Sequence, residues 1–230
     1  MLINNLLQTL VRRKTPVNFL DFSRKTPISR VFGLDRGTPI DRYYIEKFLR
    51  KHSNLIKGHV LEVAENRCCK LYGSHQVESC DILSTASTNK HITIVSDLTN
   101  TETLPKGKMD CFICTQTFNF IYEVQKAVEG AYYLLRSGGV LLATVAGLCQ
   151  ISRYDMDRWG DYWRFTTASV ERLFGTVFKD NVEIESFGNV LAAVAFLQGA
   201  AVEDLPNPEL LDEHDPDYQV LITIVARKGF

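Results

Sequence analysis

The stretch LEVAENRCCKLYG, residues 61–73, decides how the rest of the chain is interpreted. It begins with apolar residues of strand length and continues into a polar turn, as the first strand of an α/β nucleotide-binding fold does. Turns of that kind usually carry glycines, yet none lies between Gly58 and Gly73. The stretch is therefore either a cofactor loop that functions without glycine or a core strand followed by a surface turn.

Predicted helices and strands alternate along the rest of the chain. A helix begins near Thr38, with Pro39 and Asp41 in its first turn, and Gly58 can end it. Further strands are predicted over residues 77–84, 91–98, 109–116, 140–147, 182–189 and 218–228, and further helices over 120–136, 167–178 and 190–205. Most of these strands are continuous apolar runs, which is typical of a parallel sheet covered on both faces. We expect an α/β fold, a three-layer, doubly wound and mostly parallel seven-stranded sheet.

Composition and charge exclude several classes of protein. The 230 residues include 26 basic and 27 acidic side chains, without the clustered basic excess of a nucleic-acid-binding surface. No apolar run reaches the ~18–20 residues of a membrane helix, so we expect no stable membrane association. The six cysteines match neither a zinc spacing nor a disulfide framework. We therefore expect a cytoplasmic protein without a metal site.

The chain divides into two predicted parts. Residues 1–37 form an N-terminal helix-and-loop extension, in which MLINNLLQTLVRRK has the apolar-then-basic order of an amphipathic helix rather than that of a signal peptide. Residues 38–230 form the main domain. Its length suits one domain with a sizeable core.

Four short stretches, in their order and spacing, resemble the class I S-adenosylmethionine-dependent methyltransferases. They are VLEVAEN (60–66), VESCD (77–81), IVSDL (94–98) and LLRSGGVLLATVAG (134–147). A fifth, DYWRFT (161–166), resembles a segment that follows the fifth strand in small-molecule and sugar methyltransferases of this class. The resemblance covers roughly residues 40–228. It implies a Rossmann-like sheet and S-adenosylmethionine as cofactor.

The resemblance also implies a cofactor site at the carboxyl ends of the strands. Asp81 would accept hydrogen bonds from the ribose hydroxyls, and Asp97 with Leu98 would lie beside the adenine. Thr115 and Gln116 would lie under the sulfonium. The methionine end would face Glu62, Ala64, Glu65 and Asn66.

These residues also have interpretations that involve no ligand. Asp81 could be a turn residue, and Asp97, followed by LTNTE, could cap a turn or helix. Glu62 lies inside an apolar strand, where an acid without a partner is costly, and this favours a function. Ala64 in place of glycine is compatible with a cofactor that lacks a pyrophosphate, and equally with a domain that has lost its cofactor.

Aromatic and charged residues are concentrated after the fifth predicted strand. QISRYDMDRWGDYWRFT (150–166) contains both tryptophans of the chain. The segment is either the wall of an acceptor pocket for a hydroxylated ring or a lid that packs its tryptophans on the core. The acceptor-side candidates are Arg153, Asp157, Trp159, Trp163 and Arg164, together with Asp35 and Arg36 from GLDRGT (33–38).

Two residues are candidates for acid–base catalysis. His214, with Asp215 or Asp217 nearby, is a candidate base because histidine titrates near neutral pH. Asp157 is the second candidate. The alternative for His214 is a polar loop before the last strand.

Together these features predict transfer of a methyl group from S-adenosylmethionine to an oxygen of a small hydroxylated acceptor, such as a sugar or a natural product. One alternative is a methyltransferase-like domain without activity that serves as a partner or scaffold. Another is a nucleic-acid methyltransferase, although the basic patch and the Asn-Pro-Pro-aromatic and double-cysteine signatures are missing. An NAD-binding enzyme would need a Gly-x-Gly-x-x-Gly turn, which the chain lacks.

Overall fold

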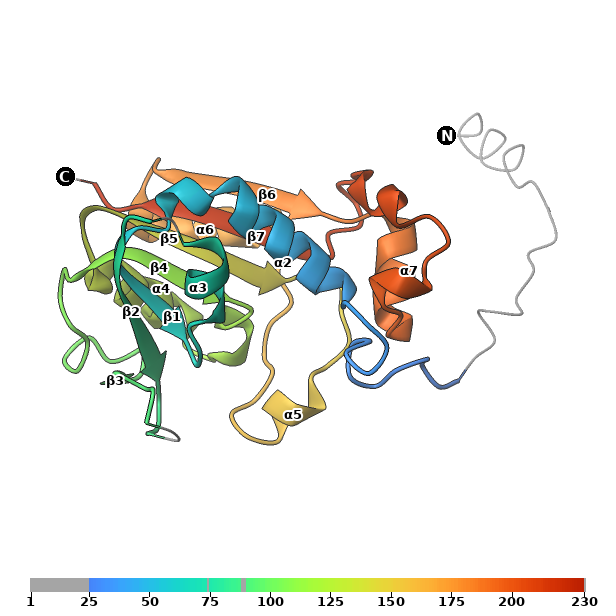
Figure 1. Cartoon of the computed structure of the whole chain (residues 1–230), viewed down its shortest axis with the longest axis horizontal. Helices are drawn as coiled ribbons and strands as arrows, with labels where there is room; N and C mark the ends of the chain where they lie inside the picture. Colours follow the sequence, from blue (N-terminus) through green and yellow to red (C-terminus); the bar gives the residue numbers. More distant parts are fainter. Residues whose placement is uncertain (1–24, 74, 88–89, 230) are drawn as a thin grey trace, which may run out of the picture.

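The computed structural model describes residues 25–73, 75–87 and 90–229 (Figure 1). The helix predicted at the start of the N-terminal extension lies outside these residues. Residues 25–38 form bends and turns that lead into the first described helix.

A seven-stranded sheet with the order β3-β2-β1-β4-β5-β7-β6 forms the centre of the molecule. β7 runs antiparallel to its neighbours β5 and β6, and the other pairs are parallel. The predicted fold class is confirmed. The strands are β1 (Gly58–Val63), β2 (Val77–Ser84), β3 (Ile94–Val95), β4 (Met109–Thr115), β5 (Leu135–Ala146), β6 (Val182–Phe187) and β7 (Leu221–Arg227).

Helices cover both faces of this sheet and complete the three layers (Figure 1). On one face lie α2 (Ile40–Lys51), α3 (Arg67–Tyr72) and α7 (Val190–Gln198). On the other face lie α4 (Val124–Leu134) and α6 (Thr167–Phe178). The short α5 (Arg153–Met156) lies on the connection between β5 and α6, away from the sheet. No helix in the described part of the chain is long and apolar enough to cross a membrane.

The strands are continuous apolar runs because each contributes to two cores. In β4, Phe112 and Cys114 belong to the core under α4 and α6, while Cys111 and Ile113 belong to the core under α2 and α7. All four side chains are fully buried. Successive side chains of a strand point to opposite faces, so a sheet covered on both sides needs apolar residues at every position.

Several element boundaries differ from the prediction. The helix predicted over residues 120–136 ends at Leu134, and β5 starts at once, so that RSGG lies in the strand and not in a turn. The helix predicted over residues 190–205 ends at Gly199, whose φ of 71° is the left-handed conformation that commonly ends helices. The third strand is only two residues long.

Two features near the first loop were not predicted. One is α3, directly after the first loop. The other is a disulfide between Cys69 of α3 and Cys80 of β2, which contradicts the expectation of a chain without disulfides. Both lie beside the stretch that resembles the first methyltransferase motif.

Candidate functional site

A cavity of about 1060 Å³ opens at the carboxyl ends of the strands. The order of the strands across the sheet switches between β1 and β4, because β2 and β3 lie on one side of β1 and β4 lies on the other. Ligands of open α/β sheets bind outside the carboxyl ends of the strands at such a switch point. The rest of the lining includes residues 30–32, Leu34 and much of the segment between β5 and α6. The strand-end lining residues are Val63, Ala64, Leu83, Ser84, Ser96, Thr115 and Ala146.

The first loop adopts a glycine-like backbone without glycine. Ala64, the first residue after β1, has a φ of 65°, which is the left-handed region that costs an L-residue roughly 1–2 kcal/mol. Its amide donates to the carbonyl of Leu83 at 2.9 Å, which holds the loop against β2. The question raised by the sequence therefore has a structural answer: the loop keeps the conformation that glycine usually provides.

Glu62 holds this loop from inside the sheet. It is 4% exposed, and its two carboxylate oxygens accept hydrogen bonds from the amides of Cys68 and Cys69, at 3.0 and 2.9 Å. These amides belong to the first turn of α3, where backbone donors have no partner within the helix. Burial raises the pKa of Glu62, while the two amide hydrogen bonds oppose that rise. Glu62 lines the cavity, and its observed role is to fix the loop and helix that follow β1.

Backbone strain is concentrated around the cavity. Among the described residues, four non-glycine residues have positive φ, and three of them line the cavity: Phe32 at 61°, Ala64 at 65° and Gln116 at 49°. The fourth, Lys179, ends α6. Strained residues persist where the surrounding structure fixes them, and they are enriched at functional sites.

The end of β2, where the ribose was expected to bind, differs from the prediction. Asp81 does not stand at the end of β2, because the strand continues to Ser84 and Asp81 pairs with Leu61 in mid-strand. Asp81 does not line the cavity, whereas Ser84 and Thr85 do. Hydroxyl groups therefore occupy the end of β2, where we expected a carboxylate.

The expected adenine and sulfonium residues line the cavity. Asp97 and the buried Leu98 lie there, and Asp97 Oδ1 also accepts hydrogen bonds from the amide and hydroxyl of Thr99, both at 2.8 Å. Asp97 thus caps a turn and still faces the cavity. Thr115 and Gln116 line it at the end of β4. Of the first-loop residues, Glu65 lines the cavity, and Asn66, at the start of α3, does not.

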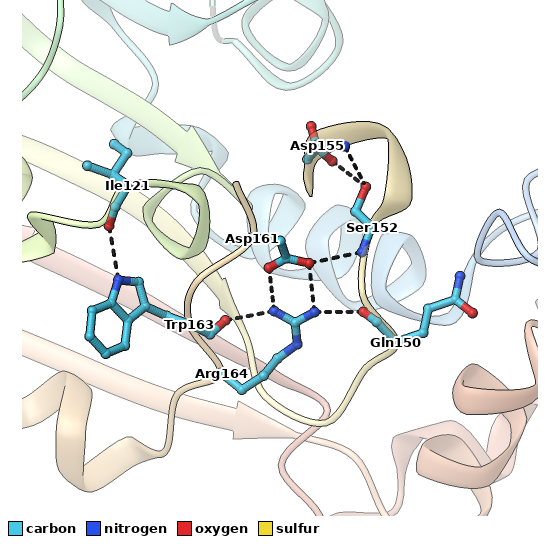
Figure 2. Close-up of polar contacts among 7 residues, drawn as sticks. All are labelled: Ile121, Gln150, Ser152, Asp155, Asp161, Trp163 and Arg164. Atoms are coloured by element: carbon cyan, nitrogen blue, oxygen red, sulfur yellow. Dashed lines mark hydrogen bonds and ion pairs between the residues drawn. The ribbon is translucent and has the colours of Figure 1, made fainter. Parts of the chain in front are cut away.

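An ion pair orders the segment between β5 and α6. Arg164 donates to both oxygens of Asp161, at 2.6 and 2.8 Å, and to the carbonyl oxygens of Gln150 and Trp163 (Figure 2). Asp161 also accepts the amide of Ser152 at 2.9 Å. Burial acts to raise the pKa of Asp161, but the hydrogen bonds from Arg164 and Ser152 outweigh it and leave the pKa lowered. Arg164 lines the cavity, and its guanidinium is occupied by these contacts.

The two tryptophans of this segment have different positions. Trp159 lines the cavity, is half exposed and meets Tyr154 edge to face. Trp163 does not line it; its indole donates to the carbonyl of Ile121 at 3.0 Å (Figure 2). The same ring stacks on Tyr122. The wall and the lid interpretations each describe one of the two tryptophans.

The remaining acceptor-side candidates are only partly brought together. Arg153 lines the cavity, while Asp157 is exposed and lies outside its lining, 3.6 Å from Arg153. Asp35 accepts the hydroxyl of Ser29, and Arg36 makes two hydrogen bonds of 2.7 Å to Asp204 on the surface. Neither Asp35 nor Arg36 lines the cavity.

His214 lies at a different place from the cavity. It is exposed, 3.1 Å from the hydroxyl of Ser186, and lines a smaller cavity near β6. Asp215 and Asp217 hydrogen-bond within the turn that leads to β7. The structure therefore places the predicted histidine base away from the strand ends.

The lining residues that sequence reasoning missed include Asp41, Asn119 and Asp161. Asp41 was read only as the start of a helix, and Asp161 only as part of a resembling stretch. Asn119 carried no signal, because it lies in an aromatic stretch before a helix. Within the described residues, no group of three or more His, Cys, Asp or Glu could hold a metal ion.

The cavity fits S-adenosylmethionine in its dimensions and in its first loop. The left-handed Ala64 leaves backbone accessible beside β1, and Asp97 Oδ2 is not engaged in the capped turn. Glu62 and Glu65 supply negative charge near the place expected for the methionine end. The departure is at the ribose position, where Ser84 and Thr85 replace an acid.

Comparison with known proteins agrees with this geometry. A family model described as a methyltransferase domain matches residues 56–143, the part of the chain that contains β1 to β4 and most of β5. Residues 56–143 are therefore similar to a methyltransferase domain. This match agrees with the predicted family, the class I S-adenosylmethionine-dependent methyltransferases, and with the predicted enzyme class and cofactor. No curated protein matches the chain by sequence.

Solved structures share the fold of this chain at low sequence identity. An S-adenosylmethionine-dependent methyltransferase from Mesorhizobium loti has a TM-score of 0.54 at 14% identity, covering 85% of this chain and 100% of that one. A SAM-dependent methyltransferase from Archaeoglobus fulgidus has a TM-score of 0.53 at 13% identity, covering 81% and 94%. The cyclase SpnF has a TM-score of 0.54 at 12% identity, covering 88% of each chain. These likenesses concern the fold, and function is argued from the site.

Proposed function

We propose that the protein transfers a methyl group from S-adenosylmethionine to an oxygen of a small hydroxylated acceptor, such as a sugar or a natural product. The observation that supports this proposal is the composition of the large cavity at the carboxyl ends of the strands. One wall of this cavity consists of the loops at the strand ends, which suit the cofactor. The other wall contains Trp159, Tyr154 and Tyr162. Aromatic faces beside polar groups suit the binding of a hydroxylated ring.

The size of the cavity favours a small acceptor. Cavities for drug-sized ligands span about 300–1,000 Å³, so about 1060 Å³ suits a cofactor and a small second molecule. The net charge of the chain is −1, which gives no general attraction for a phosphate backbone. The proposal therefore includes a small-molecule acceptor and excludes nucleic acid and stable membrane association.

When bound, S-adenosylmethionine supplies a methyl group on a positively charged sulfur. The chain contributes position and environment. Glu62 fixes the first loop and α3 through two backbone amides. The ion pair of Asp161 with Arg164 fixes the aromatic wall on the other side. Holding two reactants in reacting geometry accounts for a large share of catalysis in transfer reactions of this kind.

The end of β2 favours a second candidate, a methyltransferase-like domain that serves as a partner or scaffold. Without an acid there, a ribose would lose charge-assisted hydrogen bonds worth about 1.5–3 kcal/mol. One structure of the same fold is named a cyclase, so the fold alone does not specify methyl transfer. Cofactor binding distinguishes the candidates, because only the first requires it.

The test is methyl transfer from labelled S-adenosylmethionine to a panel of sugars, phenols and other hydroxylated compounds. The proposal expects label in an acceptor that forms an ether, and loss of transfer in a Trp159→Ala variant, because Trp159 lines the acceptor wall. Binding of S-adenosylhomocysteine without transfer to any acceptor of the panel would contradict the acceptor class. Absence of cofactor binding would favour the scaffold.

A cytoplasmic location belongs to the same proposal, and it has its own test. The disulfide between Cys69 and Cys80 is of a kind that reducing compartments disfavour. The proposal therefore expects both side chains to be thiols in cells. Thiol labelling under denaturing conditions, immediately after lysis, measures whether Cys69 and Cys80 are reduced. If both residues resist labelling, the cytoplasmic location is contradicted.

A further inference from the structure

Three polar side chains converge on the cavity from two separate parts of the chain. Asp41 comes from the first turn of α2, and Gln116 and Asn119 come from the connection between β4 and α4. Gln116 Nε2 donates to Asp41 Oδ2 at 3.4 Å, so the helix before the sheet and the end of β4 meet here. None of the three belongs to the first loop or to the ribose position.

Two oxygen atoms of this cluster have no hydrogen-bond partner. Among the described residues, the buried side-chain polar atoms without a partner are Gln116 Oε1 and Asn119 Oδ1, and both residues line the cavity. Asn119 is only 3% exposed. An unsatisfied buried acceptor is destabilising, so such groups are normally paired in the functional state. Both atoms can accept a hydrogen bond from a ligand.

Asp41 adds a carboxyl group whose charged neighbour is Arg42, without an ion pair between the two side chains. No ion pair involves Asp41 in the part of the chain that the structure describes; its hydrogen bonds come from the amide of Arg42 at 2.8 Å and from Gln116. Among the arginines that line the cavity, Arg164 is occupied by Asp161, and Arg42 acts on Asp41 electrostatically. Burial raises the pKa of Asp41, and a cation bound next to it would lower that pKa again.

The cluster thus offers three oxygen acceptors and a negative charge. A protonated primary amine has the complementary chemistry, since it carries three N–H donors, one positive charge and no acceptor. We propose that Asp41, Gln116 and Asn119 form a subsite for an ammonium group carried by the methyl acceptor. The substrate class becomes a small hydroxylated amine, such as an amino sugar. This inference rests on the proposed function.

The cofactor also carries an ammonium group, so the source of the amine has to be decided. The backbone carbonyl of Asn119 accepts the amides of Tyr162 and Trp163, at 3.0 and 3.2 Å, which ties the cluster to the segment that forms the acceptor wall. The negative groups on the first-loop side of the cavity are Glu62 and Glu65. The contacts of Asn119 therefore favour the acceptor as the source.

The first experiment compares matched amine and alcohol pairs. Binding of glucosamine against glucose, and of tyramine against tyrosol, is measured by ligand-observed NMR titration with saturating S-adenosylhomocysteine. We expect at least one amine to bind tenfold or more tightly than its alcohol, and Asp41→Asn to remove that preference. The inference is overturned if no amine is preferred, or if the preference survives in Asp41→Asn.

Two further variants distinguish a loss of the subsite from a folding defect. Asn119→Leu removes the buried acceptor at similar volume and should reduce the amine preference at least threefold. Asp180→Asn, an exposed acid outside the cavity, should leave it unchanged. Thermal melting of each variant is recorded in parallel. A loss of amine preference in Asp180→Asn as well would overturn the assignment to the cluster.

The second experiment separates the two sources of the amine. S-adenosylhomocysteine carries the cofactor's amino-acid ammonium, and 5′-methylthioadenosine does not. We expect Asp41→Asn to bind both compounds within threefold of the unsubstituted protein. A tenfold loss for S-adenosylhomocysteine alone would assign the cluster to the cofactor and overturn the inference. Failure of the unsubstituted protein to bind either compound contradicts the proposed function and is seen before any variant is compared.

Discussion

Arg164 and Asp161 form a two-point ion pair whose hydrogen bonds are 2.6 and 2.8 Å long, with the Asp161 side chain almost entirely buried (Figure 2). The same arginine donates to the carbonyl of Gln150, and the same aspartate accepts the amide of Ser152. The ion pair therefore connects both ends of the segment between β5 and α6. The position of the aromatic wall of the cavity depends on this ion pair.

Asp161→Asn tests how much the ion pair with Arg164 contributes to the free energy of unfolding. The amide can accept at one atom only and presents N–H groups to the guanidinium, so we expect the free energy of unfolding to fall by about 2–4 kcal/mol at pH 7. The comparison variant is Asp157→Asn, whose exposed pair with Arg153 at 3.6 Å should change it by less than about 0.5 kcal/mol. Urea unfolding measures both.

The same variant has a defined pH dependence. The pKa of Asp161 is lowered in the folded protein, so its contribution to stability is present above the ordinary value of 3.8 and is lost as the pH falls through the lowered pKa. The difference between the protein and Asp161→Asn should therefore shrink below pH 3.8. A difference that stays constant down to acid unfolding would show that the charge of Asp161 is not what stabilises the segment.

Ala64→Gly tests the strained first loop. Glycine adopts a φ of 65° without the steric cost of a Cβ atom, so we expect a gain of about 0.5–1 kcal/mol in unfolding free energy and retained binding of S-adenosylhomocysteine. Ala64→Val, which places a β-branched residue in the same conformation, should lose stability and binding. Ala195→Gly, inside α7, should lose about 1 kcal/mol. If Ala64→Gly and Ala195→Gly change stability by the same amount, Ala64 is not strained in solution.

The disulfide between Cys69 and Cys80 predicts a dependence of stability on reductant. It closes a sequence separation of 11 residues, for which chain-entropy estimates give about 3 kcal/mol. Cys80→Ser should lose this amount and become insensitive to dithiothreitol. Cys149→Ser should retain the sensitivity of the unsubstituted protein, because Cys149 is a free thiol. Equal unfolding free energies with and without reductant would show that the two residues are thiols in solution.

The sheet could be predicted because its strands are covered on both faces. The apolar runs 77–84 and 109–116 agree with β2 and β4 to within one residue, and α6 begins and ends where its pattern predicts. The fold class follows from the alternation of these runs with helices, independently of any loop residue. The site depends on loops and strand ends, where periodicity carries little information.

Asp81 illustrates this limit. The sequence suggested that β2 ends at this acid, but Ile82 and Leu83 continue the pairing with Glu62 and Val63 of β1. Their burial, at 4% and 2% exposed, extends the strand past the acid. Partner register decides where a strand ends, and one strand's own residues do not reveal it.

Tertiary contacts also explain the features that were missed. α3 is six residues long, which is too short to show helical periodicity in the sequence, and it is held by the carboxylate of Glu62. Without α3, nothing in the sequence places Cys69 beside Cys80. Asp41 and Gln116 are 75 residues apart and meet only because α2 packs beside the end of β4.

Calorimetric titration with S-adenosylhomocysteine tests the central claim most directly, that this cavity binds the cofactor through a first loop without glycine. The account predicts micromolar binding, about tenfold weaker in Glu62→Gln, because the amide would oppose one of two backbone donors. It predicts unchanged affinity in Asp81→Asn, since Asp81 does not line the cavity. No heat and no shift in melting temperature at millimolar ligand, or a loss of binding in Asp81→Asn with none in Glu62→Gln, would contradict it.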